Sequence, residues 1–274
     1  MSHKVTVAVA QQNAVLGDAR ENARRAENAI QNAADREAAL VVLPECYLTG
    51  YVTNSREQAL AIAIAPDGPE FQSLVRACQR LGMHAIVGFL ERAGAQVFNS
   101  VAVIGPSGVI GAYRKRHLPF MGADKFVTVS EETEPQIFDT AVGRIGIAIC
   151  YEIRFPEVMR TLALAGADLI ALPTNWPVQA NILADHFTRV RAAENFVYFL
   201  VANRGDSEEG VNFLGDSQIV NPLGEVLAKA DSEEALLIAE VDLDRARDKT
   251  ITFQKGEFEV SPWKDRRPAA YRLY

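Results

Sequence analysis

The chain has 274 residues, 49% of them hydrophobic and 23% charged, which is the composition of an ordinary globular protein. Its formal net charge of −7 disfavours a protein that binds nucleic acid or a membrane surface. No apolar run reaches membrane-spanning length, and the first residues lack the apolar stretch of a signal peptide. Because the three cysteines have no framework spacing and the four histidines are scattered, we expect a reduced, cytoplasmic protein that binds no metal.

In the first half of the chain, short apolar runs alternate with Ala-rich segments. We expect Asp18 to cap a helix that runs to Glu37, and Gly68-Pro69-Glu70 to open a second helix that stops at Gly82. The apolar runs predict strands over residues 5–10, 40–43, 85–90, 97–104 and 109–113. This alternation favours an α/β fold.

The second half repeats the alternation. Its patterns predict helices over residues 156–165 and 182–195, and strands over residues 144–150, 169–172, 197–202, 217–220 and 235–241. Segments 38–44 and 167–173 resemble each other, since each follows an Ala-rich helix and ends in Pro before a polar residue. We therefore expect two pseudo-equivalent halves within a single domain, residues 1–274, with two sheets faced by helices.

Residues 255–274 form a tail in which aromatic side chains stand among charges. Four aromatic residues lie here: Phe258, Trp263, Tyr271 and Tyr274. We expect this tail to pack on the body of the protein or on a partner subunit.

The most informative residue is Cys150, which ends the apolar run 145–150 and is followed at once by a charged, Pro-broken turn. A cysteine inside an apolar strand is most often a small buried hydrophobe. Here, however, the strand ends, and we do not expect the charged residues Glu152, Arg154 and Glu157 to share the burial of the thiol. This position favours a nucleophile at the rim of a sheet.

Two other strand ends carry matching chemistry. Glu45 follows an aliphatic strand and Pro44, where a carboxylate either caps the next turn or, in a dry pocket, has a raised pKa that suits a general base. Lys115 lies in the basic cluster Tyr113-Arg-Lys-Arg-His117, which is either a solvated face or a source of positive charge for an anionic intermediate. A thiol, a base and a cation at strand ends are what acyl transfer through a thioester requires.

These motifs together resemble those of the nitrilase, or carbon–nitrogen hydrolase, superfamily. The resemblance spans nearly the whole chain, and the segments that carry it are Pro44-Glu45, Tyr113-Arg-Lys115-Arg-His-Leu118, Gly146-Ile-Ala-Ile-Cys150-Tyr-Glu-Ile-Arg-Phe-Pro-Glu157, Pro173-Thr-Asn175-Trp176, Arg191-Ala-Ala-Glu194-Asn195-Phe-Val-Tyr198, Asn203-Arg204, Gly215-Asp-Ser217 and Asn221-Pro-Leu-Gly224-Glu225. The resemblance implies a four-layer α-β-β-α sandwich that pairs into an eight-layer homodimer or a larger homo-oligomer. It implies no metal and no organic cofactor.

The resemblance also implies roles for individual residues. It makes Glu45 the general base, Lys115 the stabiliser of the oxyanion and Cys150 the nucleophile, with the backbone N–H of Tyr151 completing the oxyanion hole. Many members have a further acid between the lysine and the cysteine, and here Asp124 and then Glu131 fall nearest by spacing.

Other parts of the resemblance concern the surroundings of the triad. Asn175 and Trp176 are expected to line the pocket, and Glu194 and Asn195, beside Arg191, to buttress the loop of the cysteine. An ion pair of Arg191 with Glu194 fits the same helical stretch.

The segment after the cysteine resembles the short amidases, including the ω-amidase-like branch. We therefore expect hydrolysis of a small linear amide through a Cys150 thioester, with release of ammonia and a carboxylic acid. The enzymatic alternative is an N-carbamoyl amino acid hydrolase or a nitrilase that uses the same triad. The non-enzymatic alternatives, a redox-reactive thiol protein or a catalytically inactive interaction protein, leave Glu45 and Lys115 unexplained. Arg154 either holds a substrate carboxylate or forms a salt bridge with Glu152 or Glu157.

Overall fold

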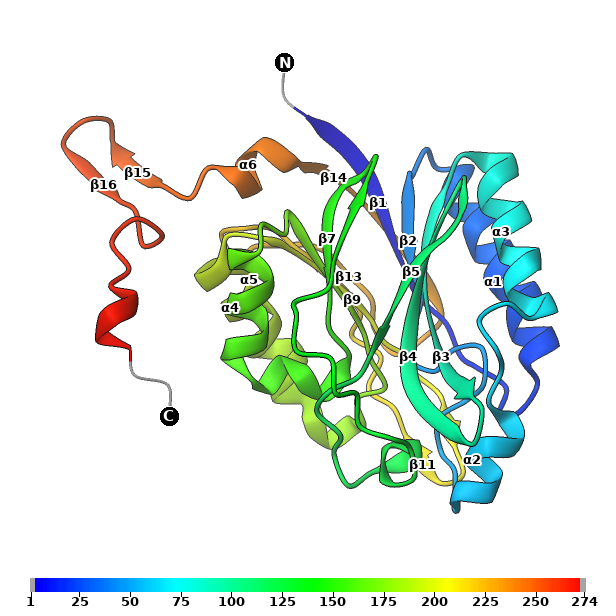
Figure 1. Ribbon diagram of the computed structural model, residues 1–274. Coiled ribbons are helices and arrows are strands. Elements are labelled where there is room, and N and C mark those ends of the chain that lie inside the picture. The colour runs from blue at the N-terminus through cyan, green and yellow to red at the C-terminus, as the bar shows by residue number, and fades with distance from the viewer. Residues whose placement is uncertain (1–2, 272–274) are drawn as a thin grey trace.

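The computed structural model of the protein describes residues 3–271, whose elements form four layers in the order helix, sheet, sheet, helix (Figure 1). The first six-stranded sheet has the order β14 (Ala235–Asp242), β1 (Lys4–Gln11), β2 (Leu40–Val42), β3 (His84–Ala93), β4 (Gln96–Gly105), β5 (Gly108–Arg114). The second has the order β13 (Val226–Lys229), β12 (Gln218–Val220), β9 (Tyr198–Ala202), β8 (Leu169–Pro173), β7 (Gly143–Ile147), β6 (Ile137–Thr140). The expected α-β-β-α sandwich is confirmed.

The two sheets have the same internal pattern. In each sheet three neighbouring strands are parallel, β1, β2 and β3 in the first and β7, β8 and β9 in the second, and antiparallel strands flank them. The two similar segments of the sequence form β2 and β8, which are the middle strands of these parallel sets. This correspondence explains why the two halves of the chain look alike.

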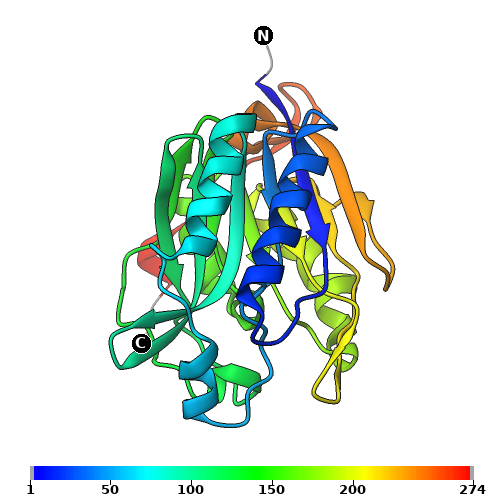
Figure 2. The same ribbon diagram turned by 90° about the vertical axis from the view of Figure 1, so that its right-hand side faces the viewer.

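Helices cover the outer face of each sheet. The first sheet is covered by α1 (Ala19–Ala34) and α3 (Pro69–Leu81), and the second by α4 (Pro156–Leu164) and α5 (Thr188–Asn195) (Figures 1 and 2). Asp18 caps α1 by accepting a hydrogen bond from the Glu21 backbone, and Gly82 ends α3 in a left-handed conformation with φ of 67°. Two short helices, α2 (Arg56–Ile62) and α6 (Leu243–Arg247), lie outside these layers.

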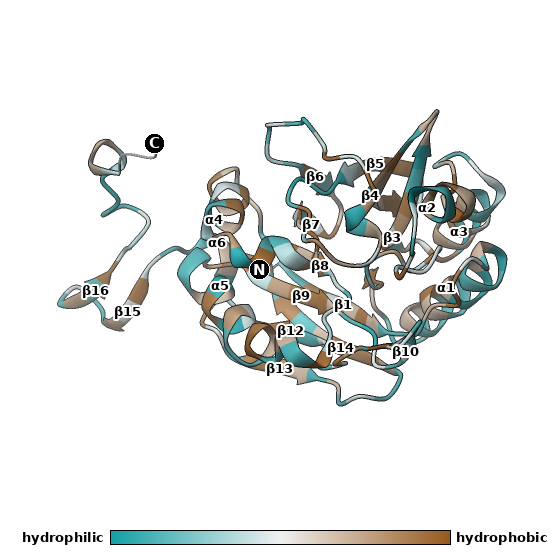
Figure 3. Cartoon of the chain, turned by 90° about the horizontal axis from the view of Figure 1, so that it is seen from below, coloured by the Kyte–Doolittle hydropathy of each residue, from teal (hydrophilic) through white to brown (hydrophobic). Residues whose placement is uncertain are grey.

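Among the described residues, two large apolar cores hold the layers together, beside a smaller third cluster. One lies between the sheets and under α4 and α5, where Val9 and Val42 from the first sheet pack with Ile147 and Leu200 from the second. The other lies between the first sheet and its helices, where the buried face of α1 is formed mainly by alanines and Ile30. Figure 3 shows the apolar colour concentrated on the strands in the middle of the molecule.

Several boundaries differ from the sequence prediction. The strand expected to reach Cys150 ends at Ile147, because Cys150 has φ of 46° and starts the 3₁₀ turn Cys150–Arg154. The helix expected over residues 182–195 is a π turn, Leu183–Phe187, followed by α5. The segment 54–67 contains α2, although no helix was predicted there.

The C-terminal segment leaves the body of the protein. Its hairpin of β15 (Ile251–Gln254) and β16 (Phe258–Val260) and the turn Pro268–Ala270 stand beside the sandwich rather than within it (Figures 1 and 3). Tyr274, which the sequence prediction included in this tail, lies outside the described residues. Within residues 3–271, no helix is both long enough and apolar enough to cross a membrane.

Candidate active site

Cys150 lies at a sharp turn between β7 and α4. The left-handed backbone of a non-glycine residue is strained, and such strain is often found where a side chain is presented for function. The residue is only 5% exposed. Burial and the nearby Glu45 carboxylate raise the pKa of its thiol, while the Lys115 ammonium acts in the opposite direction. The resting thiol is therefore protonated and needs a base to become a nucleophile.

Glu45 follows β2 and is held against β3. A Cβ at Gly88 in β3 would lie 2.5 Å from the Pro44 carbonyl oxygen, so glycine permits this close approach. Glu45 Oε1 accepts hydrogen bonds of 2.7 Å from Lys115 Nζ and 2.7 Å from Asn99 Nδ2. Its Oε2 is buried and has no hydrogen-bond partner among residues 3–271. Burial, opposed by the Lys115 ammonium, raises the pKa of Glu45, as a general base near neutral pH requires.

Lys115 comes directly after β5 and lies between two carboxylates. Its Nζ is 2.7 Å from Glu45 Oε1 and 2.7 Å from Asp124 Oδ2, and all three side chains are fully buried. Burial lowers the pKa of Lys115, but the carboxylates of Asp124 and Glu45 outweigh this effect and raise it well above its usual value. The ammonium is therefore a permanent positive charge with one N–H left over, since an ammonium has three.

Asp124 and Glu131 were the two candidates for a further acid, and they lie in different environments. Asp124 is in the 3₁₀ turn Gly122–Lys125 and is buried. Besides Lys115, its carboxylate accepts hydrogen bonds of 3.0 Å from the Tyr51 hydroxyl and 2.9 Å from Asn99 Nδ2. Glu131 is exposed in a surface depression beside Arg114. The structure thus brings Asp124, and not Glu131, to the buried cluster.

Two of the expected pocket residues follow β8, and a third follows Cys150. Asn175 is buried after β8, and its Nδ2 donates a 2.9 Å hydrogen bond to the Glu45 carbonyl oxygen. Trp176 is buried beside it, and its backbone N–H donates to Asn203 Oδ1 at 3.0 Å. Tyr151 is half-buried, next to Cys150.

Arg154 is exposed on the turn that follows Cys150. Within residues 3–271, Arg154 forms no salt bridge with Glu152 or Glu157, and the Glu152 carboxylate instead accepts hydrogen bonds from the Tyr113 hydroxyl and the Ile149 backbone N–H. The expectation that Glu152 stays out of the buried region was wrong. Its side chain is completely buried, with three donors around it and with His117 Nδ1 at 3.1 Å.

Arg191 supports the cysteine turn from α5. Its Nη1 forms the expected ion pair with Glu194 at 2.8 Å, and its Nε donates a 3.0 Å hydrogen bond to the Ile153 carbonyl oxygen within the turn. Asn195 donates to the Arg191 carbonyl oxygen at 2.9 Å. These contacts attach the cysteine turn to α5.

Sequence reasoning missed two buried polar residues of this region, Asn99 and Tyr51. Asn99 lies in β4 and contacts both Glu45 and Asp124. The signal was present, since an asparagine interrupts the apolar run 97–104 and a buried amide must find partners.

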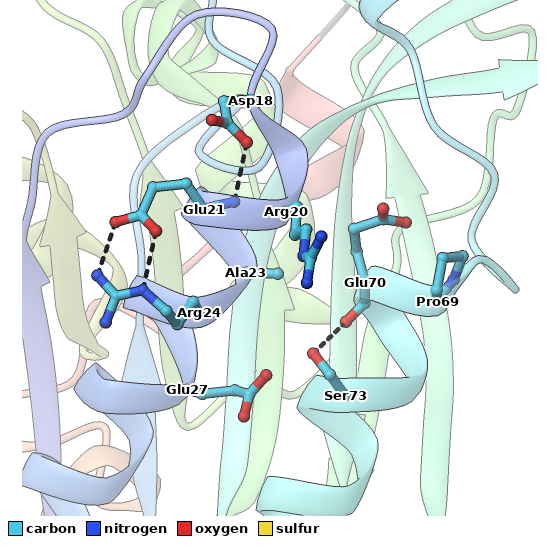
Figure 4. Close-up of a pocket in the computed structure, with 9 residues that line it drawn as sticks. All are labelled: Asp18, Arg20, Glu21, Ala23, Arg24, Glu27, Pro69, Glu70 and Ser73. Carbon is cyan, nitrogen blue, oxygen red and sulfur yellow. Dashed lines mark hydrogen bonds and ion pairs between the residues drawn. The ribbon is translucent and has the colours of Figure 1, made fainter.

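A separate depression of about 690 Å³ lies on the outer face, between α1 and α3. Figure 4 shows Glu21 paired with Arg24 and the Ser73 hydroxyl bonded to the Glu70 carbonyl oxygen, while Arg20 and Glu27 make no interaction with the other residues drawn. It contains none of the residues of the buried cluster. This depression is therefore separate from the buried cluster at the strand ends.

Comparisons with known proteins agree with this location. Residues 6–250 match the family model for carbon–nitrogen hydrolases. A nitrilase from Pyrococcus abyssi (strain GE5 / Orsay) is 38% identical over 97% of this chain and 99% of its own length. An N-carbamoylputrescine amidase from Solanum tuberosum is 32% identical over 98% of this chain and 94% of its own. The crystal structure of an amidase from Nesterenkonia sp. superposes with a TM-score of 0.77, at 25% identity, over 90% of this chain and 93% of that one.

The match over nearly all of the chain defines an enzyme class, the hydrolases of carbon–nitrogen bonds other than peptide bonds. This protein belongs to the carbon–nitrogen hydrolase family, in the nitrilase superfamily.

Proposed function

We propose that the protein hydrolyses the C–N bond of a small linear amide through a thioester on Cys150, with release of ammonia and a carboxylic acid. The observation that carries this proposal is the buried Glu45–Lys115 pair beside the Cys150 thiol, which combines a base with an unpartnered oxygen and a cation with an unused N–H. Because Cys150 is only 5% exposed, the proposal is restricted to small substrates.

In the first half of the proposed reaction, Glu45 takes the thiol proton and the sulfur attacks the carbonyl carbon. The remaining N–H of Lys115 and the backbone N–H of Tyr151 stabilise the tetrahedral oxyanion. The C–N bond then breaks, the proton held by Glu45 passes to the leaving nitrogen, and ammonia departs.

In the second half, water attacks the thioester carbon while Glu45 accepts its proton. The C–S bond breaks, the carboxylic acid leaves, and the proton returns to the Cys150 sulfur. Asp124 is the proposed further acid: its contact with Lys115 keeps the ammonium charged and in place through both halves.

Hydrolysis of an N-carbamoyl compound or a nitrile is the second candidate. This candidate is supported by the similarity of the chain to an N-carbamoylputrescine amidase and to a nitrilase. A carbamoyl amino acid would bring a carboxylate, for which Arg154 is the nearest exposed cation after Cys150 in the sequence.

The test is ammonia release from a panel of small amides, nitriles and N-carbamoyl amino acids, measured with the wild-type protein and with Cys150→Ala. Release from amides but not from nitriles, reduced about 10³-fold or more by the substitution, is expected. Cys78→Ala is the matched control, since Cys78 is also buried and free but lies on α3. Undiminished release by Cys150→Ala would refute the nucleophile, and release only from nitriles or carbamoyl compounds would favour the second candidate.

The proposal includes a homodimer in the cytoplasm. The β15–β16 hairpin carries Phe253 and Phe258, which are 75% and 65% exposed, and such apolar exposure favours a protein partner for this hairpin, which leads into the tail 255–274. All three cysteines are free, which suits a reducing compartment. Sedimentation of the wild-type protein and of Phe253→Ser/Phe258→Ser tests the dimer, with the mass of a monomer expected for the double variant.

A further inference from the structure

Asn99 stands at the centre of the buried polar cluster. Its single amide nitrogen donates hydrogen bonds to Glu45 Oε1 at 2.7 Å and to Asp124 Oδ1 at 2.9 Å. Its backbone carbonyl oxygen accepts a 2.8 Å hydrogen bond from the Lys115 backbone N–H. One residue of β4 therefore contacts both carboxylates and the lysine between them.

The orientation of the amide is itself fixed. The Cys46 thiol donates to Asn99 Oδ1 at a Sγ–Oδ1 distance of 3.5 Å, so the oxygen of the amide faces the thiol and the nitrogen faces the carboxylates. Burial raises the pKa of Cys46 well above its usual value, so this thiol stays protonated and remains a donor. Both N–H groups of the amide are then used on the two acids.

These contacts leave the two oxygens of Glu45 in unequal positions. Oε1 accepts from Asn99 and from Lys115, whereas Oε2 has no partner among the described residues. An oxygen that already accepts two strong hydrogen bonds is a weaker base than one that accepts none.

We propose that Asn99 is a positioning residue, which holds the Glu45 and Asp124 carboxylates on either side of Lys115 and leaves Glu45 Oε2 as the atom that receives the thiol proton. This inference rests on the proposed function of Glu45, Lys115 and Cys150. Asn99 itself need not touch the substrate, since it acts through the two acids.

The consequence is a specific change in the pH profile. Hydrogen bonds from Asn99 and Lys115 oppose the effect of burial on the pKa of Glu45, so loss of the Asn99 donor raises that pKa further. The fraction of ionised base at a given pH then falls, and the acid limb of kcat/KM moves to higher pH. A merely structural role would lower the amount of folded enzyme without moving the limb.

The experiment measures kcat, KM and the acid limb for the wild type, Asn99→Ala and Asn99→Asp. For Asn99→Ala we expect the limb to move up by about one pH unit and kcat at neutral pH to fall about ten- to a hundredfold, with KM changed less than kcat. Asn99→Asp keeps the shape of the side chain but brings a third carboxylate to the cluster, so its limb is expected to move in the same direction. A folded variant of either kind with the wild-type limb overturns the inference.

The matched control is Ser100→Ala, at the next position of β4. Ser100 is also fully buried, and its hydroxyl donates a 2.7 Å hydrogen bond to the buried carboxylate of Glu91, which lies outside the cluster. This variant is expected to lose stability and to keep the wild-type acid limb. Should neither Asn99 variant fold, Cys46→Ala removes the thiol that orients the amide. Its limb is then expected to move up, and an unmoved limb overturns the inference.

The outcome separates the two proposals. Undiminished hydrolysis by Cys150→Ala would refute the proposed function whatever the Asn99 variants do. Loss of hydrolysis in Cys150→Ala together with an unmoved limb in Asn99→Ala would refute the role of Asn99 alone.

Discussion

The Glu152 carboxylate accepts a 2.7 Å hydrogen bond from the hydroxyl of Tyr113, and this bond joins the two sheets at the proposed catalytic site. Tyr113 is on β5, two residues before Lys115, and Glu152 is in the turn two residues after Cys150. The cation and the nucleophile of the proposed mechanism thus come from different sheets, and this bond sets their relative position.

Glu152 also contacts the segment that follows β5 and the residue that precedes Cys150. Its Oε1 accepts from the Arg116 backbone N–H at 3.1 Å and lies 3.1 Å from His117 Nδ1. Its Oε2 accepts a 2.8 Å hydrogen bond from the backbone N–H of Ile149. A carboxylate can accept from the Tyr113 hydroxyl and from both backbone N–H groups because it is an acceptor at every lone pair.

Replacing Glu152 by Gln is expected to weaken this junction. One acceptor oxygen becomes an NH₂ group that faces other donors, which costs about 1–3 kcal/mol in the free energy of unfolding. We expect kcat to fall as well, since Lys115 and Cys150 lose their fixed separation. Urea unfolding and steady-state kinetics measure both effects. Glu157→Gln is the control, because Glu157 is exposed on the following helix. Equal stability of the two variants would contradict the role of Glu152.

Lys115→Met tests the buried charges directly. The substitution leaves the carboxylates of Glu45 and Asp124 buried without their cation, so we expect the protein to lose about 3–5 kcal/mol of stability at neutral pH. In the wild type, the raised pKa of Lys115 means that its contribution is fully present at neutral pH and is lost only as the pH rises through that pKa. In the variant, the loss is expected to shrink at acidic pH, where the Glu45 carboxyl, whose pKa is raised by burial, becomes protonated.

Thermal unfolding of Lys115→Met between pH 4 and pH 8 measures this dependence. Lys125→Met serves as its control, since Lys125 lies beside Asp124 in the same turn but is exposed. A loss of stability in Lys115→Met that does not change with pH would mean that lost packing, and not unpaired charge, is responsible.

Glu45→Gln is expected to have the opposite effect on stability. The pKa of Glu45 is raised mainly by burial, so the folded state binds the proton more tightly than the unfolded state does. The ionised carboxylate therefore reduces stability once the pH exceeds the unfolded pKa. Gln carries no charge and leaves Lys115 paired with Asp124, so we expect an increase of about 1 kcal/mol at pH 8, or about 2–4 °C in Tm, with loss of activity. The increase should vanish at acidic pH, and a lower Tm at pH 8 would contradict this account.

Local patterns in the sequence predicted two sheets faced by helices, and the family resemblance implied their four-layer order. Apolar runs marked the strands, and chemistry at strand ends pointed to Glu45, Lys115 and Cys150 as candidates. The positions of Asn99 and Glu152 could not be inferred in this way. Asn99 meets Glu45 across 54 positions of the chain and Glu152 meets Tyr113 across 39, so their contacts depend on strand register and on the packing of the two sheets. The φ of 46° at Cys150 is likewise imposed by the surrounding structure.

Substitution of Arg191 tests whether contacts outside the buried polar cluster are needed to hold the Cys150 turn in place. Its guanidinium binds the Ile153 carbonyl oxygen through Nε and Glu194 through Nη1, so one side chain joins the turn to α5. Lysine keeps the charge but is a single point donor and cannot reproduce both bonds. For Arg191→Lys we expect a loss of about 1 kcal/mol in stability and a several-fold decrease in kcat, because the turn gains freedom.

Arg189→Lys is the matched control on the same helix. Arg189 Nε also donates to a backbone carbonyl oxygen, that of Gly224 at 2.9 Å, which belongs to a loop far along the chain from the cysteine turn. We expect this variant to lose a similar amount of stability and to keep its kcat. If both variants lower kcat equally, α5 affects catalysis only through general stability. If only Arg191→Lys lowers kcat, the hydrogen bond to Ile153 holds the turn of the proposed nucleophile in place from α5. The geometry of Cys150 then depends on the second helical layer as well as on the two sheets.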